Sequence, residues 1–77
     1  MYEKRNLSEL SVGESATVGG VTHAGSARRR LMELGLSAGR EVTCVGVSPL
    51  GDPHAYILSG AVIAIRNSDA RGILLES

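Results

Sequence analysis

One segment of this 77-residue chain has the periodicity of a helix, and it constrains the fold more than any other feature. The segment is Ser26–Gly39, which reads SARRRLMELGLSAG. Ser26 is a suitable N-cap, because its hydroxyl can accept a hydrogen bond from an unpaired backbone N–H of the first turn. One apolar stripe at the helical period is predicted to be buried, and it consists of Ala27, Leu31 and Leu34. We predict that Gly35 ends the helix in a Schellman motif, in which Leu36 packs on Leu31.

Short runs of strand-forming residues make up most of the remainder, and ten glycines favour tight turns between them. The predicted strands are Glu14–Val21, Glu41–Val47, Ala55–Leu58, Val62–Arg66 and Gly72–Leu75. Gly19-Gly20 predicts a bulge in the first strand, and Ser59-Gly60 predicts a tight hairpin. A type II turn is predicted over Ser37–Arg40, and one helical turn over Asn67–Ala70. These elements predict an all-β fold, namely a small β-barrel with one short α-helix between the first and second strands, in a single domain over residues 1–77.

The composition limits both the core and the cellular compartment. The chain has no Phe or Trp and two Tyr, so Val, Leu, Ile and Ala must build the core. Eight basic and eight acidic residues give zero net charge, which argues against a general nucleic-acid binder. The single Cys44 lies in an apolar run and favours a reducing cytosol, with its thiol buried as a small apolar side chain. Without a signal peptide or a run of about 20 apolar residues, we expect a cytoplasmic protein with no direct membrane insertion.

Several motifs follow one another in an order that is typical of one family. They are L-x-x-L-x-x-G (Leu7, Leu10, Gly13), RRRLMELGL (Arg28–Leu36), G-x-x-V (Gly39, Val42), GDP (Gly51–Pro53) and IAIR (Ile63–Arg66). Over almost the whole chain this pattern resembles the FeoA family. The resemblance implies an SH3-like β-barrel. It also implies a small cytoplasmic accessory protein of bacterial ferrous iron uptake, which binds and regulates the FeoB-type membrane iron transporter from the cytoplasmic side.

Two positions depart from the family pattern. Ala38 stands where many members have Pro, at the second position of the predicted type II turn. Because Ala restricts the unfolded chain less than Pro does, we expect a free energy of unfolding that is lower by about 0.4–1 kcal/mol. The strand at His54-Ala55-Tyr56 is also poorer in large aliphatic residues than is usual for the family.

The arginine cluster provides the candidate partner-binding residues. At 100° per residue, Arg28 and Arg29 point away from the apolar stripe, and Met32 lies between them. Arginine is enriched at interface hot spots, so we predict that these three residues bind the partner, the alternative being an ordinary solvated helix face. Arg30 lies beside Leu34, and we predict that its stem packs on the barrel while its guanidinium bonds locally.

The sequence supports catalysis and metal binding less than it supports partner binding. The potential metal ligands are His23, Cys44, Asp52 and His54. None of them has the spacing of a known metal motif. Asp52 and His54 are close enough in sequence to pair, but no activated nucleophile accompanies them. We therefore predict no enzyme activity, no metal and no cofactor. An arginine finger, in which Arg28 or Arg29 completes a GTPase site in trans, is a narrower alternative.

Two further alternatives concern other kinds of partner. SH3-like barrels also form the C-terminal domain of iron-dependent transcriptional repressors, so a related regulatory module stays open, although no nucleic-acid binding is predicted. Self-association is the other alternative, through an edge strand at Ala55–Leu58 with Tyr56 exposed.

Overall fold

The computed structural model describes residues 5–76, which form five strands, two α-helices and one 3₁₀-helix. The strands are β1 (Ser15–Val21), β2 (Glu41–Val47), β3 (His54–Leu58), β4 (Ala61–Ile65) and β5 (Ile73–Leu75). The helices are the 3₁₀-helix η1 (Leu7–Glu9), α1 (Gly25–Glu33) and α2 (Asn67–Ala70). The predicted fold class is confirmed, including the helix between the first two strands. The bounds of β2 agree with the prediction, and the other strands differ by a single residue at one or both ends.

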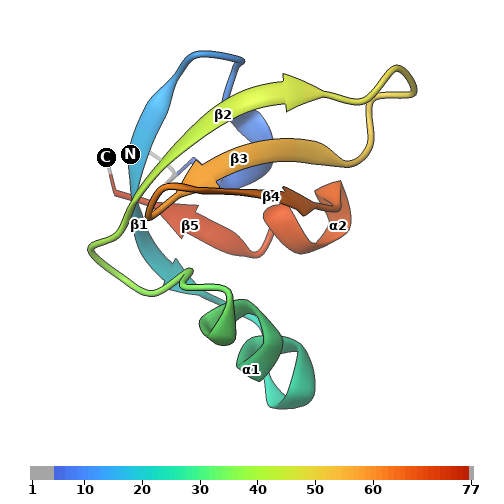
Figure 1. Ribbon diagram of the computed structural model, residues 1–77. Coiled ribbons are helices and arrows are strands. Elements are labelled where there is room, and N and C mark those ends of the chain that lie inside the picture. Colours follow the sequence, from blue (N-terminus) through green and yellow to red (C-terminus); the bar gives the residue numbers. More distant parts are fainter. Residues whose placement is uncertain (1–4, 77) are drawn as a thin grey trace.

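One antiparallel sheet with the strand order β4-β3-β2-β1-β5 forms the body of the molecule (Figure 1). β1 connects its two halves, because residues 15–17 pair with β2 whereas residues 18–21 pair with β5. The register shifts between Val18 and Gly20, which confirms the predicted bulge. A bulge bends and twists its strand, so β1 can pass from one half of the barrel to the other.

The predicted turns are present. Ser59 and Gly60 have φ angles of 52° and 83°, and two consecutive positive values are those of a type I′ hairpin. The Arg40 N–H donates to the Ser37 carbonyl at 3.2 Å, and Gly39 has a φ of 92°, as the predicted type II turn requires.

Helix α1 ends as predicted but begins differently. The Gly35 and Leu36 N–H groups donate to the carbonyls of Met32 and Leu31 at 2.9 and 3.2 Å, which is the complete Schellman motif. The predicted Ser26 N-cap is wrong. The N-cap is Ala24, whose side chain has no acceptor atom, and its carbonyl already receives the first helical bond from the Arg28 N–H.

The core is aliphatic around one buried tyrosine. Its fully buried members include Leu7, Val18, Leu31, Leu36, Val42, Cys44, Tyr56 and Ile73. The prediction that Tyr56 is exposed on an edge strand is wrong, because its side chain has zero exposure and β3 lies between β2 and β4. The Tyr56 hydroxyl donates to the Leu7 carbonyl at 3.3 Å, and burial raises the pKa of this tyrosine to about 12. Burial of Cys44 is confirmed.

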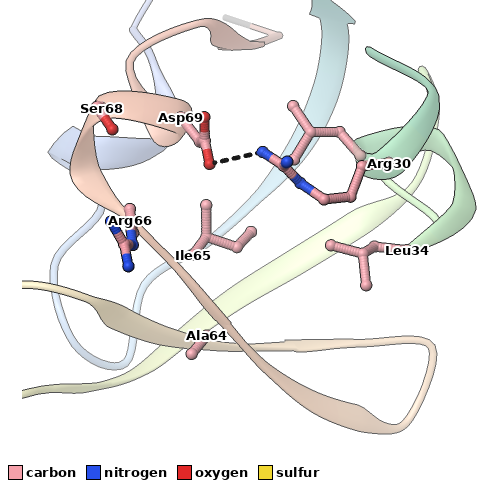
Figure 2. Close-up of a pocket in the computed structure, with 8 residues that line it drawn as sticks. Arg30, Leu34, Ala64, Ile65, Arg66, Ser68 and Asp69 are labelled. Carbon is pink, nitrogen blue, oxygen red and sulfur yellow. Dashed lines mark hydrogen bonds and ion pairs between the residues drawn. The ribbon is translucent and has the colours of Figure 1, made fainter. Parts of the chain in front are cut away.

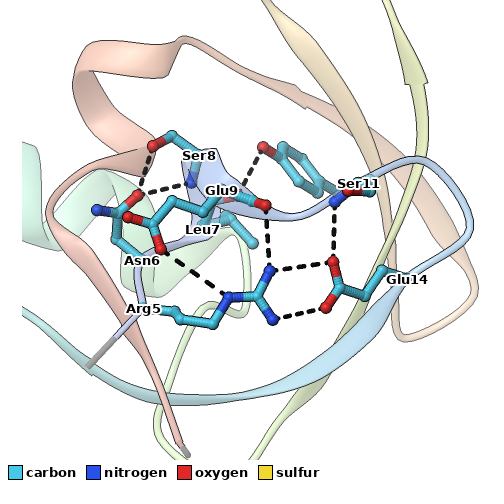
Figure 3. A network of polar contacts seen from close by, with 8 residues as sticks. Arg5, Asn6, Leu7, Ser8, Glu9, Ser11 and Glu14 are labelled. Atoms are coloured by element: carbon cyan, nitrogen blue, oxygen red, sulfur yellow. Dashed lines mark hydrogen bonds and ion pairs between the residues drawn. The ribbon is translucent and has the colours of Figure 1, made fainter. Parts of the chain in front are cut away.

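The N-terminal segment is fixed by an exposed polar network around Arg5 (Figure 3). The Arg5 guanidinium donates to both Glu14 carboxylate oxygens, at 2.6 and 3.0 Å, and to the Glu9 carbonyl at 3.1 Å. The Ser11 N–H donates to the same carboxylate at 3.0 Å. These donors stabilise the charged form and hold the pKa of Glu14 at about 2, below its ordinary value of 4.5.

The same segment covers one edge of the sheet. Asn6 forms a β-bridge with Leu74, and the Leu75 N–H donates to the Arg5 carbonyl at 2.8 Å. The outer edge of β5 is therefore paired, as edges that resist unwanted strand addition commonly are.

Candidate docking site on helix α1

The three predicted partner-binding residues share helix α1 but differ in their surroundings. Arg28 and Arg29 are exposed. The position of Met32 off the apolar stripe predicts that it is exposed as well, and this is corrected, because Met32 is half-buried. The Arg28 guanidinium donates to the Val21 carbonyl at 3.1 Å, at the end of β1. Within residues 5–76, Arg29 makes no side-chain hydrogen bond and no ion pair. The helix thus presents one tethered and one untethered guanidinium beside a partly accessible thioether.

The Arg30 guanidinium bonds to a neighbouring side chain, as predicted, although that neighbour is far away in the sequence. Its guanidinium lies 3.3 Å from a carboxylate oxygen of Asp69, the third residue of α2. The other Asp69 oxygen lies 3.6 Å from Nε2 of His23, which precedes α1. Asp69 therefore connects α2 with both α1 and the segment that leads into it.

An open groove of about 550 Å³ lies between α1, β4 and α2 (Figure 2). Its apolar side is formed by Leu31, Leu34, Ala64 and Ile65, and its polar side by Arg30, Arg66, Ser68 and Asp69. Leu34 lies on this groove with 42% of its surface exposed, so the prediction that it belongs to a buried stripe is wrong. The reason is that β4 does not close over α1. Leu31 is the one side chain of α1 that is fully buried.

Sequence reasoning missed the part that Asp69 and Arg66 play here. The sequence places Asp69 in a polar helical turn and Arg66 at the end of a strand, and neither position indicates the groove. Their approach to α1 depends on how β4 and α2 fold back, over a separation of 39 residues between Arg30 and Asp69. No local spacing in a single sequence encodes such a contact.

The four potential metal ligands are not brought together. His23 faces Asp69, Cys44 is buried, and the Nδ1 of His54 lies 3.5 Å from the Tyr56 hydroxyl. An Asp52 oxygen accepts the Asn67 N–H at 2.9 Å and thereby caps α2. In the described part of the chain, no group of three His, Cys, Asp or Glu residues is arranged to hold a metal ion. Nor does any helix of that part have the length and apolar character needed to cross a membrane.

Comparison with curated proteins finds a two-part relative. The chain is 36% identical over 70 residues to the Fe(2+) transport protein A/Fe(2+) transporter FeoB fusion protein of Porphyromonas gingivalis. The match includes 91% of this chain but only 8% of that much longer protein.

Solved structures with the same fold include FeoA proteins of two bacteria. A FeoA-like protein from Clostridium acetobutylicum is 33% identical, with a TM-score of 0.87, over 99% of this chain and 88% of that one. FeoA from Stenotrophomonas maltophilia, a prokaryotic SH3 domain protein complexed with zinc, is 36% identical with a TM-score of 0.82. That match covers 94% of this chain and 89% of the other. The SH3-like character of the barrel is thereby confirmed.

A likeness to repressors is confined to the fold. A manganese-dependent transcriptional repressor superposes with a TM-score of 0.83, but its identity is 17% and only 43% of its chain is covered. In contrast, the FeoA domain family matches residues 5–77, which is nearly the whole sequence. The order of motifs, the barrel and these matches agree, and the chain belongs to the FeoA domain family.

Proposed function

We propose that this protein is a non-catalytic cytoplasmic accessory of bacterial ferrous iron uptake, which binds a FeoB-type transporter and regulates it. The observation that carries the proposal is the relative in which a segment like this chain is fused to the transporter FeoB. Fusion holds two domains at a high effective concentration, which suits partners that work in contact. As the resemblance to the FeoA family implies, the FeoB-type transporter carries a cytoplasmic GTP-binding domain, and we propose that this domain is the part that the barrel contacts.

We further propose that α1 docks on the transporter through Arg28, Arg29 and Met32. The helix buries one side chain fully against the barrel, so its other side is available. A guanidinium presents five donors in a planar fork that matches carboxylates, and methionine adapts its shape to an apolar partner. The partner surface that fits this set carries carboxylates around an apolar patch.

The experiment is a calorimetric titration of the protein with the isolated cytoplasmic domain of the transporter from the same organism. Substituting Arg28→Ala, Arg29→Ala and Met32→Ala together should weaken binding at least about tenfold, because hot-spot residues contribute more than about 1 kcal/mol each. The melting temperature should fall only modestly, since the variant loses the exposed contact between Arg28 and the Val21 carbonyl and part of the packing of the half-buried Met32, while the fully buried Leu31 is kept.

A matched control distinguishes docking from a general loss of charge. Arg40→Ala with Val12→Ala removes one exposed guanidinium and one apolar side chain that is 59% exposed, both outside α1. This control should bind like the parent protein. Equal binding by the triple variant and the parent would refute the α1 docking site, and no binding by the parent would refute the proposed partner.

A further inference from the structure

The two edge strands of the sheet differ in whether their outer sides are paired. The outer edge of β5 is covered by residues 5 and 6, as described above. β4 pairs with β3 on one side, and nothing in the described region pairs with its other side. Natural edge strands are usually protected by a charge, a proline or a covering segment. β4 has the sequence AVIAI, so its own residues include neither a charge nor a proline.

The hairpin geometry identifies which backbone groups are unpaired. Leu58 and Ala61 flank the two-residue loop and are register partners, and in such a hairpin this first pair exchanges both hydrogen bonds. Because bonded and non-bonded pairs alternate, Ala61, Ile63 and Ile65 bond to β3. Val62 and Ala64 direct their N–H and C=O groups to the outer edge. Both residues are exposed, Val62 to 65%.

We propose that this edge binds the β4 strand of a second copy of the chain, giving a two-fold dimer with one sheet continuous across both molecules. Antiparallel pairing centred on Ile63 sets Val62 against the copy's Ala64, and Ala64 against the copy's Val62. In this register, Val62 and Ala64 of each strand both form backbone hydrogen bonds with the other strand. The inference is independent of the proposed function.

Charge favours a second copy as the occupant. In this register the uncharged residues of β4 face one another, and Arg66 comes opposite the copy's Gly60 instead of another cation. The chain has no net charge, so two copies do not repel each other. On the outer face of the sheet, Val62 adjoins Ile57, which is 40% exposed, so pairing also covers apolar surface.

The test combines sedimentation equilibrium with residue-resolved amide hydrogen exchange on the full chain. An interface of two short strands is small and belongs to the weak class, so concentrations should extend to about 1 mM. The protein should shift from monomer to dimer over this range. The Val62 and Ala64 amides should exchange about fivefold more slowly when the chain concentration is about ten times the dissociation constant, since only the monomer then exchanges.

Internal and matched controls accompany this readout. The Ala61, Ile63 and Ile65 amides, which bond to β3, should exchange at a rate that does not depend on concentration. Ala64→Pro removes an outward N–H without breaking a bond to β3 and should abolish the dimer. Should that variant fail to fold, Val62→Lys places a hydrated charge on the edge and should act similarly, whereas Val12→Lys should dimerise normally.

Three outcomes would overturn the inference. The first is a protein that stays monomeric at every concentration. The second is hydrogen exchange of the Val62 and Ala64 amides at a rate that does not depend on concentration. The third is a dimer that still forms with Ala64→Pro and with Val62→Lys. A dimer that persists in this way would have to use another surface.

Discussion

At the scale of single residues, the ion pair between Arg5 and Glu14 makes the free energy of unfolding depend on pH in the acid range. The pKa of Glu14 is about 2 in the folded protein and 4.5 in the absence of its donors. A carboxyl group whose pKa is lowered by folding contributes stability that is fully present above pH 4.5 and is lost as the pH falls towards 2. Glu14→Gln should therefore flatten the decline of the urea midpoint within this window, while lowering stability at neutral pH.

Glu33→Gln is the control for that experiment, because Glu33 is an exposed carboxylate outside the Arg5 network. Its pH profile should follow that of the parent protein. Identical acid profiles for the parent and for Glu14→Gln would show that the pair does not couple folding to protons.

Tyr56 shows where residue-scale prediction from sequence fails. Composition correctly required an aliphatic core, but a tyrosine in a short strand can face either way, and its neighbours His54 and Ala55 gave no strong alternation. In the structure it faces the core with Leu58, and its hydroxyl donates to the Leu7 carbonyl, 49 residues away. A buried hydroxyl needs such a partner, and a single sequence does not reveal it.

At the scale of elements, features encoded within a few residues were predicted well. The Schellman end of α1 and the tight hairpin at Ser59-Gly60 each depend on a glycine with a positive φ, and the pair Gly19-Gly20 indicates the bulge in β1. The start of α1 was predicted wrongly, because a good capping residue at Ser26 does not prevent the helix from beginning earlier at Gly25.

The helix end supplies a prediction at this scale. Gly35 has a φ of 100°, and a Cβ there would lie 3.3 Å from the Cδ2 atom of Leu58. Gly35→Ala should lower the free energy of unfolding by about 1–2 kcal/mol, the cost of a left-handed conformation for a residue with a Cβ. Urea denaturation measures this change directly.

Gly20→Ala is the matched comparison for Gly35→Ala. Gly20 has no positive φ, and a Cβ there meets nothing within 4 Å. This variant should be close to neutral. Equal losses at the two positions would mean that any glycine replacement destabilises the chain, and the special role of Gly35 would be refuted.

At the scale of the whole molecule, sequence patterns predicted which strands exist but not which of them lie at the edges. The predicted edge at Ala55–Leu58 is an inner strand, and the edges are β4 and β5. Strand order depends on how β1 turns from β2 to β5, and this follows from pairing over long separations. The groove beside α1 was not predicted for the same reason, because its walls come from α1 and from the distant segment of β4 and α2.

We expect the molecule to be uneven in stability, with α1 opening more easily than the sheet. The helix buries only Leu31 fully, and the Asp69 carboxylate ties it to α2 through Arg30. Exposed ion pairs contribute up to about 1 kcal/mol, so Asp69→Asn should speed hydrogen exchange of the α1 amides by up to about fivefold. Amides of β2 and β3, which open only when the whole domain unfolds, should change much less.

Asp52→Asn provides the comparison that locates this effect. It alters another carboxylate that holds α2, but from the loop between β2 and β3, where Asp52 accepts the Asn67 N–H. The α1 amides should then exchange at the parental rate. If Asp69→Asn instead accelerated exchange equally in α1, β2 and β3, helix and sheet would open as one unit. The Asp69 contacts would then stabilise the whole barrel and not the attachment of a helix that can move separately.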